Sequence, residues 1–291
     1  MTPNGAPKGP ILVIGDFCID VALRAGASRL SRERPLPVFD LEDIAAAGGC
    51  ASNAARQVAA YGAEVRLLPV AEAVKIRGLS GLPEQEVFRL DGSWAVVSAE
   101  RLVPQLAELA DVPFSAAIYV DYRGLAGPPP TASRFLARLP CPQMADARRS
   151  LRGWRGLSVL KMNARDAGLP DQPSLQEFRR AYNRIGVPIV VLTRGPLGHI
   201  VLGPDTAWEE PVCSLPGPVL NVSGAGDVFT ATLAVLLASA WERYSSNPSA
   251  ELVHEASKTA ALAAGLRIRK AGYNETVTWE EIETCKSAML S

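Results

Sequence analysis

The chain has 291 residues, of which 48% are hydrophobic and 21% are charged; these proportions are typical of a globular protein with a large core and exclude disorder as the default state. Lysine and arginine together number 30, as do aspartate and glutamate, so the formal net charge is zero. Such a chain has no overall positive field that would attract nucleic acid or an anionic membrane, and any phosphate site must be local. No low-complexity linker divides it, which favours one α/β domain over residues 1–291.

The five cysteines lie far apart and form no Cys-x-x-Cys pair; they are Cys18, Cys50, Cys141, Cys213 and Cys285. This spacing predicts reduced thiols and does not indicate a zinc site or a redox couple. The first ten residues lack the apolar core of a signal peptide, and no run approaches the roughly 20 apolar residues of a membrane span. We therefore expect a cytoplasmic protein with no membrane partner.

The N-terminal region has a strand-helix-strand pattern. Ile11 to Gly15 is short and β-branched and ends in Gly-Asp, which predicts a buried strand that ends where ligands bind in α/β sheets. A helix is expected over Ser52 to Tyr61, with Gly62 as its C-cap, and a strand over Val65 to Pro69.

Further strands alternate with helical segments, and this alternation predicts a mostly parallel sheet. The expected strands are Val74 to Leu79, Val87 to Leu90, Ala116 to Val120, Leu157 to Lys161, Ile189 to Thr193 and Ile200 to Leu202. Two long alanine-rich segments, Ala225 to Ala240 and Glu251 to Ile268, are predicted to form closely packed helices.

The segment Asn221-Val-Ser-Gly-Ala-Gly-Asp227 directly precedes the first of these helices. Its small residues let an anion approach backbone N–H groups at a helix N-terminus, where the partial positive charge offsets charge on a transferring phosphoryl group. Asp227 is placed to accept the proton of an attacking hydroxyl. The alternative interpretation is a glycine turn followed by an acid that complements the helix dipole.

A second segment combines Gly48-Gly49 with Asn53 at a helix entry, while Asp16 and Asp20 follow the first strand. Carboxylate and amide groups bind several hydroxyls at once, and glycine lets a sugar ring come close to the backbone. These residues are therefore candidates for binding a polyol. The alternative is a tight turn and an N-cap.

Taken together, the Gly-Gly-x-x-x-Asn and Gly-Ala-Gly-Asp segments resemble the two signatures of the PfkB (ribokinase-like) carbohydrate kinases. The resemblance spans nearly the whole chain. It is closest to the D-glycero-β-D-manno-heptose 7-phosphate kinase branch, through segments that look like those of that branch: Ser28-Arg-Leu-Ser-Arg-Glu-Arg-Pro-Leu-Pro-Val38, Lys75-Ile-Arg77, Phe88-Arg-Leu-Asp91, Val120-Asp-Tyr122, Thr193-Arg-Gly195 and Lys270-Ala-Gly272. It implies a three-layer α/β/α fold with a mostly parallel sheet and a small β lid, formed approximately by residues 20–47 and 74–91.

The resemblance also implies roles at matching positions. Asp227 is the expected catalytic base, and Gly224, Ala225 and Gly226 are the expected anion hole. The acceptor sugar is expected to contact Asp16, Asp20, Gly49 and Asn53.

ATP and Mg²⁺ are the implied cofactors. Asn163 and Asp166 match the family's Asn-x-x-Glu positions, which act on magnesium through water and phosphate; aspartate keeps the charge but shortens the reach. The segment expected to line the nucleotide's phosphates and ribose contains Thr193, Arg194, Gly195 and Gly198.

A phosphorylated acceptor needs cationic donors. The candidates are Lys75, Arg77, Arg89, Arg123 and Arg148, although most surface arginines are only solvated. His199 and His254 are isolated and form neither a metal cluster nor a catalytic triad, so we assign them no chemistry.

The chain departs from the family pattern at two places. A Gly-Asp-Asp-x-x-Gly segment and a helix-strand unit are missing before the acceptor strands, because Pro69-Val-Ala-Glu-Ala-Val74 runs directly into Lys75. We expect a more open or reshaped acceptor site. The family's first acid in Asp-x-x-Gly-Ala-Gly-Asp is Asn221 here, and the lost charge is expected to weaken the electrostatics around magnesium.

Three functions remain open at this point. An active sugar kinase is the first, because Asp227 is retained, and its acceptor is a heptose phosphate or a related sugar or cyclitol. A kinase acting in a specialised pathway on another heptose or cyclitol is the second. The third is a catalytically silent pseudokinase that binds nucleotide or sugar as a scaffold.

Residues 34–47 are expected to form part of the lid, through which two copies of the chain can form a homodimer.

Overall fold

The computed structural model of the chain describes residues 6–81, 85–124, 127–148, 154, 156–170, 173–183, 185–272 and 274–290. A single large sheet organises these residues, in the strand order β11-β10-β9-β8-β7-β6-β1-β3-β4, with β2 paired to β1 and β5 to β3. The strands are β1 (Ile11–Leu30), β2 (Pro37–Cys50), β3 (Val65–Ser80), β4 (Gln85–Asp91), β5 (Ala95–Val96), β6 (Ala116–Val120), β7 (Gln143–Asp146), β8 (Val159–Asn163), β9 (Ile189–Thr193), β10 (His199–Leu202) and β11 (Ala207–Glu210).

The centre of the sheet is parallel, since β3, β1, β6, β7, β8 and β9 all run in one direction. The remaining pairs are antiparallel. The helices are α1 (Ala51–Ala60), α2 (Ala99–Glu108), α3 (Pro130–Leu136), α4 (Leu175–Tyr182), α5 (Ala225–Tyr244), α6 (Ala250–Arg267) and α7 (Trp279–Leu290), with a 3₁₀ turn η1 (Gly195–Leu197). The mostly parallel α/β fold expected from the sequence is confirmed.

Helices cover both faces of the sheet, which gives three layers. Along β1, alternate side chains point to opposite faces: Ile11 and Val13 pack with α1, α5 and α6, whereas Leu12 and Ile14 pack with α2, α3 and α4. Helix α5 is buried on nearly all sides because it also packs against α1 and α6, which explains why its sequence is apolar all round.

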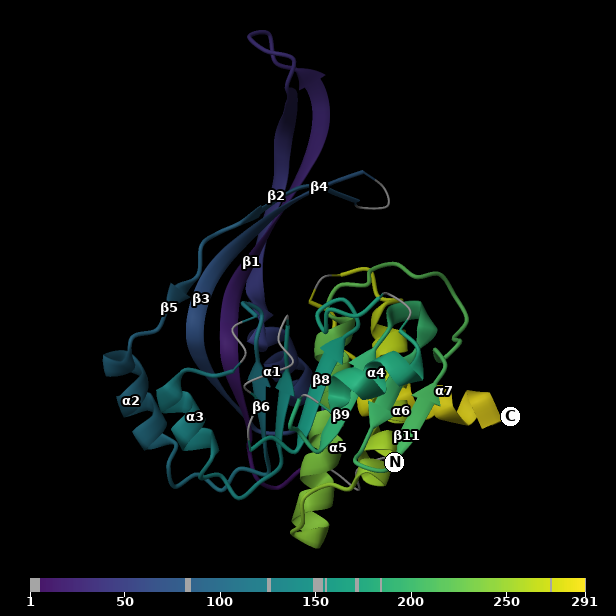
Figure 1. The fold of residues 1–291 in the computed structure, drawn as a ribbon. Coiled ribbons are helices and arrows are strands. Elements are labelled where there is room, and N and C mark those ends of the chain that lie inside the picture. Colours follow the sequence, from purple (N-terminus) through teal and green to yellow (C-terminus); the bar gives the residue numbers. More distant parts are fainter. Residues whose placement is uncertain are drawn as a thin grey trace.

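Two strands continue far beyond the core sheet and form a second structure, which we call the lid. It consists of residues 17–30 of β1, strand β2, residues 74–80 of β3 and strand β4. Figure 1 shows this ribbon of strands rising away from the helical body, with the turn between β1 and β2 at its far end. The small β lid expected from the sequence is therefore present.

Strand β3 differs from the prediction, because the two strands expected at Val65 to Pro69 and at Val74 to Leu79 are one continuous strand. Pro69 does not interrupt it, because it lies at a shift of register, where Gly15 pairs with Pro69 but Asp16 pairs with Ala71. In the described part of the chain, residues 65–69 of β3 have no strand on their outer side. The missing helix-strand unit thus leaves an open sheet edge and joins a core strand directly to the lid.

The strands at Ala116–Val120 and Ile189–Thr193 and the long helices α5 and α6 match their predictions closely. Strands β7 and β11 were not predicted; each is four residues long and gives too little pattern to recognise. Among the described helices, none combines the length and apolar character that crossing a membrane requires.

Candidate active site

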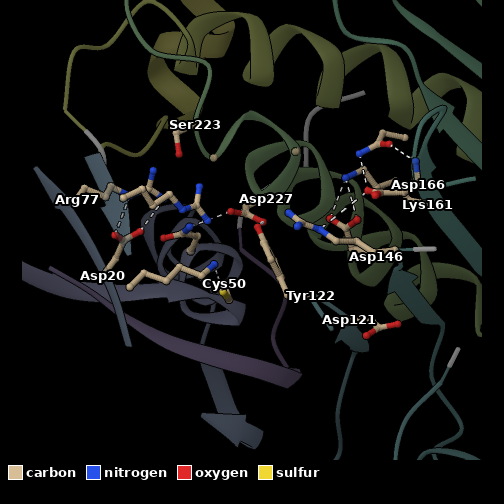
Figure 2. Close-up of a pocket in the computed structure, with 17 residues that line it drawn as sticks. Asp20, Cys50, Arg77, Asp121, Tyr122, Asp146, Lys161, Asp166, Ser223 and Asp227 are labelled. Atoms are coloured by element: carbon tan, nitrogen blue, oxygen red, sulfur yellow. Dashed lines mark hydrogen bonds and ion pairs between the residues drawn. The ribbon is translucent and has the colours of Figure 1, made fainter. Parts of the chain in front are cut away.

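A cavity of about 330 Å³ lies between the lid and the start of α5. One wall comes from the body of the protein and carries Asp227, Gly224 and Gly226 at the start of α5, together with residues at the ends of β7 and β8. The opposite wall comes from lid strands β1, β3 and β4. Figure 2 shows the side chains of the two walls converging on this space, with Asp227 and Tyr122 between them.

Asp227 lies in the first turn of α5 and is only 4% exposed. Gly224 caps the helix in the left-handed conformation (φ 79°), which glycine adopts without strain. The first N–H groups of a helix have no partner within it and carry partial positive charge. Gly224 and Gly226 line the cavity, whereas the N–H of Ala225 already donates to the carbonyl of Val222. Two of the three residues expected to form the anion hole therefore face the cavity.

Both carboxylate oxygens of Asp227 accept hydrogen bonds. Asn53 Nδ2 donates to Oδ2 over 2.9 Å, and the hydroxyl of Tyr122 donates to Oδ1 over 2.8 Å. Burial raises the pKa of Asp227, and the charge of Asp146 raises it further, against the opposing effect of these two hydrogen bonds and of Lys161. A carboxylate with a raised pKa is a stronger base than ordinary aspartate and suits proton abstraction.

Tyr122 was not assigned a role from the sequence, yet it contacts the expected base, Asp227, directly. Its ring lies between two cations, with Lys75 Nζ 5.0 Å and the Arg148 guanidinium 4.0 Å from the ring centroid. Burial and the neighbouring charge of Asp227 raise the pKa of Tyr122 well above its usual value. The phenol therefore stays protonated and remains a permanent donor to Asp227.

Lys161 and Asp146 form a second pair that the sequence analysis did not single out. Lys161 Nζ lies 2.8 Å and 3.0 Å from the two oxygens of Asp146, and Thr230 Oγ1 donates to Asp146 over 2.7 Å. Lys161 is 5% exposed, and its ammonium would lie 3.1 Å from a Cβ added at Gly226. The structure thus holds a buried positive charge directly beside the helix N-terminus. A lysine inside an apolar strand, close before the Asn163 position, was the available signal.

Strand register explains the charged face of the lid. Asp20 pairs with Lys75, Lys75 with Asp91, and Arg77 with Arg89, and directly paired residues point to the same face of a sheet. Asp20, Lys75, Arg77 and Arg89 all line the cavity, as expected. Asp20 binds Arg77 with Nε–Oδ1 2.8 Å, and Arg89 binds Asp91 over 2.9 Å.

The Gly-Gly segment lies against lid strand β1. A Cβ added at Gly49 would come within 2.7 Å of Cys18 Sγ, and one at Gly48 within 2.7 Å of Ser52. Asn53, one turn into α1, lines the cavity, and its Oδ1 accepts from Arg56 over 3.1 Å. The glycines are thus required by close packing, and Gly49 supports the cavity without being among its lining residues.

Asp16 is fully buried and does not line the cavity. It binds Arg123 with Nε–Oδ1 2.7 Å and accepts the N–H groups of Tyr122 and Arg123 at 2.8 Å each. These bonds hold residues 122–123, and so place the Tyr122 phenol against Asp227. Neither Asp16 nor Arg123 lines the cavity, so this arrangement gives no support to the contact with the acceptor that was expected from the sequence.

Asn163, the last residue of β8, and Asp166 also line the cavity. The two side chains bond to each other over 2.5 Å, and Asp166 lies 4.0 Å from Arg148. Amide and carboxylate oxygens are the donors that Mg²⁺ prefers, and Mg²⁺ usually keeps several waters and binds substrate phosphates. The donor set at this end of the cavity therefore fits a magnesium ion held mainly through water and phosphate.

The expected nucleotide segment lies next to this end, since Thr193 pairs with Asn163 across β8 and β9. Thr193, Arg194, Gly195 and Gly198 do not line the described cavity. Arg194 forms an ion pair with Glu209 at 2.7 Å, and Gly198 (φ 83°) has Glu210 O within 2.0 Å of an added Cβ, so that only glycine fits there. Their contact with nucleotide stays a prediction.

Asn221 also lies outside the cavity lining. Its Oδ1 accepts the N–H of Ser223 over 2.9 Å, and its Nδ2 donates to the carbonyl of Ala271 over 3.2 Å. The amide therefore supports the loop before α5. This geometry gives no support to the expectation that the lost charge at position 221 weakens a magnesium site.

His199 and His254 have structural partners. His199 bonds to Ser257 over 2.8 Å, and burial lowers its pKa to about 4, so the ring is neutral. His254 bonds to Glu210 over 2.5 Å and stacks on Trp208. No group of three or more potential metal ligands of the His, Cys, Asp and Glu types occurs in the described part of the chain.

Comparison with known proteins identifies the class of this fold. The structure of ribokinase from Arabidopsis thaliana complexed with ribose and ATP has a TM-score of 0.68 at 14% identity, covering 96% of this chain and 98% of that one. Ribokinase from Thermotoga maritima has a TM-score of 0.69 at 15% identity, covering 96% and 99%. The fold is therefore that of the ribokinase-like sugar kinases.

A family model described as "pfkB family carbohydrate kinase" matches residues 132–278. The chain belongs to the pfkB family of carbohydrate kinases. Curated relatives include the bifunctional protein HldE of Pseudomonas fluorescens strain Pf-5, 26% identical over 91% of this chain, and that of Coxiella burnetii strain Dugway, 27% identical over 94%. The chain spans only 61% and 63% of the length of these relatives.

Proposed function

We propose that residues 1–291 form a single kinase domain that transfers the γ-phosphoryl group of ATP to a hydroxyl of a heptose phosphate or a related sugar or cyclitol. The observation that carries this proposal is the position of Asp227. A buried carboxylate with a raised pKa begins the helix whose N–H groups, together with Lys161, face the same cavity. A base and an anion-stabilising site thus lie side by side.

In this mechanism the acceptor hydroxyl lies against Asp227 and loses its proton to the carboxylate as its oxygen bonds to the γ-phosphorus. The bond from that phosphorus to the bridging oxygen breaks, and ADP leaves. The N-terminus of α5 and Lys161 stabilise the charge on the transferring group. A bound magnesium ion would supply further charge neutralisation, with Asn163 and Asp166 as the residues that hold it. Retention of Asp227 argues against a silent pseudokinase.

The lid wall supports a phosphorylated acceptor. Arg77 and Arg89 lie directly opposite each other on the cavity side, and like charges in that position repel. Asp20 and Glu86 form ion pairs with Arg77, and Asp91 forms one with Arg89. An acceptor phosphate between the two arginines would replace carboxylates as their partner and fix the sugar with its hydroxyl toward Asp227.

ATP turnover with Mg²⁺ tests the proposal across three matched sets: heptose phosphates, hexose phosphates, and unphosphorylated sugars and cyclitols. We expect turnover with a phosphorylated acceptor and much weaker turnover with its unphosphorylated counterpart. Turnover with none of them, in a protein whose melting temperature rises with ATP, would favour the pseudokinase. Equal rates with and without the acceptor phosphate would show that the lid arginines do not bind an acceptor phosphate.

We also propose that two copies of the chain pair through the lid. The lid face that points away from the cavity is apolar: Ile19 pairs with Val74, Ile44 with Leu23, and Leu90 with Ile76. Ile19, Ile44, Val74 and Leu90 are 43–58% exposed. Exposed apolar patches of this kind mark association surfaces. Light scattering should give the mass of a dimer, and Ile44→Asp should shift it toward the monomer.

A cytoplasmic location remains part of this proposal, because ATP and sugar phosphates are solutes of that compartment.

A further inference from the structure

Two cysteines that are 32 positions apart in the sequence meet at the base of the lid. Cys18 Sγ and Cys50 Sγ lie 2.9 Å apart, and the side chains are 1% and 2% exposed. Register brings them together, since β1 and β2 are antiparallel with Phe17 opposite Cys50 and Cys18 opposite Gly49. All five cysteines are free thiols in this structure.

The pair has the surroundings of a reactive thiol and not of an inert core cysteine. Lys75 Nζ lies 3.2 Å from Cys50 Sγ, and Cys50 lines the cavity, which gives a small solute a route to its sulfur. The hydrogen bond from Cys50 lowers the pKa of Cys18, and the charge of Lys75 lowers it further, while the same hydrogen bond and burial raise the pKa of Cys50. The contact therefore favours thiolate character at Cys18, with the Cys50 thiol as its donor. Thiolate character near a cation is the usual basis of cysteine reactivity.

Neighbouring side chains hold the two sulfurs at the junction of body and lid. Cys18, Cys50 and Ala73 form a small cluster, with Trp94 and Tyr122 packed against it. Cys18 lies on β1 just where that strand enters the lid, and Cys50 immediately precedes α1, which carries Asn53. Cys50 also has a positive φ (56°, with ψ −122°), which is uncommon for a residue other than glycine.

We propose that Cys18 and Cys50 form a redox-active dithiol, a site of reversible oxidation to a disulfide by peroxides in the wall of the acceptor cavity. This goes beyond the kinase activity, and it does not depend on it. In the described part of the chain, these are the two thiols for which a direct sulfur–sulfur contact is found.

The chemistry balances with one peroxide. Cys50, the sulfur that lines the cavity, passes its proton to the Cys18 thiolate and then attacks a peroxide oxygen. A sulfur–oxygen bond forms, the oxygen–oxygen bond breaks and hydroxide leaves. Cys18 sulfur then attacks Cys50 sulfur, and its proton joins the departing hydroxyl to give water. In total one thiol and one thiolate lose one proton and two electrons, and hydrogen peroxide becomes one water and one hydroxide, which takes a proton from solvent.

Oxidation would have two structural consequences at the cavity. It turns the Cys50 sulfur, to which Lys75 donates, into a disulfide sulfur, a weaker acceptor, and so frees that ammonium for another anion. It also links β1 covalently to the residue that precedes α1, and so fixes the base of the lid relative to Asn53.

The test treats the folded full-length chain with a small excess of hydrogen peroxide, blocks the remaining thiols with an alkylating agent, and maps peptides by mass spectrometry without reduction. We expect a cross-linked pair of peptides containing Cys18 and Cys50, lighter by two hydrogen atoms than the separate peptides. Dithiothreitol should return both. The mass of the cross-linked peptides does not depend on kinase activity. The dithiol proposal can therefore be tested even if the proposed kinase function is wrong.

Matched variants define the result. Cys285→Ser, on the far helix α7, should leave the cross-link unchanged, while Cys18→Ser should abolish it and leave Cys50 to oxidise as a single residue. A denatured chain treated in the same way should form mixed pairs. The proposal is overturned if folded protein leaves Cys18 and Cys50 alkylated while other cysteines oxidise, or if Cys50 proceeds to sulfinic acid in the wild type without a disulfide.

Discussion

The two walls of the cavity are built in different ways. On the body wall, Asp227 and Lys161 are 4% and 5% exposed, and each has at least one fixed partner: Asn53 and Tyr122 for Asp227, Asp146 for Lys161. On the lid wall, the Arg89 side chain is 39% exposed, and its ion pair with Asp91 is correspondingly open to water. The groups proposed to move the phosphoryl group are thus preorganised, whereas those proposed to bind the acceptor can adjust to it. Changes to the body wall should affect catalysis, and changes to the lid wall should affect acceptor binding.

The largest effect is expected for Asp227→Asn, which removes the base. Turnover should fall by about 10²- to 10⁴-fold, the range typical of losing a general base. ATP binding should persist, because the helix N-terminus is unchanged. Steady-state rates and a thermal shift with ATP measure the two effects. Asp43→Asn on the lid, where Asp43 pairs with Arg24 away from the cavity lining, is the control; an equal loss in both variants would contradict the role of Asp227.

Lys161→Met should rank next, with turnover reduced by about 10²-fold as a charge beside the transferring group is lost. It also leaves Asp146 without its cation, and breaking a buried pair from one side costs about 3–5 kcal/mol. The double variant Lys161→Met with Asp146→Asn should recover most of the melting temperature and none of the rate. Recovery of both would reduce Lys161 to a structural partner of Asp146.

Tyr122→Phe should lower turnover by about tenfold and change its pH dependence, because a positioning hydrogen bond is worth about 0.5–1.5 kcal/mol. Asp227 must be ionised to act, so activity falls as the pH drops through its pKa, which burial already raises. The Tyr122 hydroxyl lowers that pKa. Its removal should therefore move the acid limb of kcat/KM to higher pH. Tyr244→Phe, which changes an exposed tyrosine, is the control. If Tyr122→Phe leaves the acid limb at the wild-type pH, the Tyr122 hydroxyl does not influence the pKa of the base.

Arg89→Ala tests the lid wall. A hydrogen bond to a charged group contributes about 1.5–3 kcal/mol, so the acceptor's KM should rise by about 10- to 100-fold while the KM for ATP stays unchanged. Stability should hardly change, since exposed ion pairs contribute about 0–1 kcal/mol. Arg66→Ala, on β3 outside the lid, is the matched control. A parallel rise in both KM values would place Arg89 outside the acceptor site.

Asn221→Asp should have the smallest effect. The new carboxylate keeps the bond from the Ser223 N–H and loses the donor to the Ala271 carbonyl, a change of about 1 kcal/mol. Magnesium titrations of ATP turnover should coincide for variant and wild type, because the side chain lies outside the cavity lining. A lower magnesium requirement in the variant would restore the view that position 221 influences the metal.

The sequence predicted the framework of the fold because its strands are apolar runs and its long helices are alanine-rich, signals that depend on neighbours in the chain. The short strand β7 carries Asp146 and escaped notice for lack of such a signal. Lys161 and Tyr122 acquire their roles from residues far away in the sequence, such as Gly226 and Asp227. The same holds for Asp16, whose partners lie more than 100 positions further along. Motifs identify which residue types are present, and only the fold decides which of them face the cavity.

The uninterrupted course of β1 and β3 has a mechanical consequence. A flap joined to its body through a loop swings on a few flexible residues, but here the lid is an extension of two hydrogen-bonded core strands, paired in parallel from Ile11 and Val65 to Arg24 and Leu79. Any tilt of the lid must be taken up as bending and twisting of that ribbon, along which Cys18 and Lys75 lie. The lid is therefore elastically coupled to the core sheet, and a displacement of its far end is transmitted along β1 and β3 to the residues of the cavity wall.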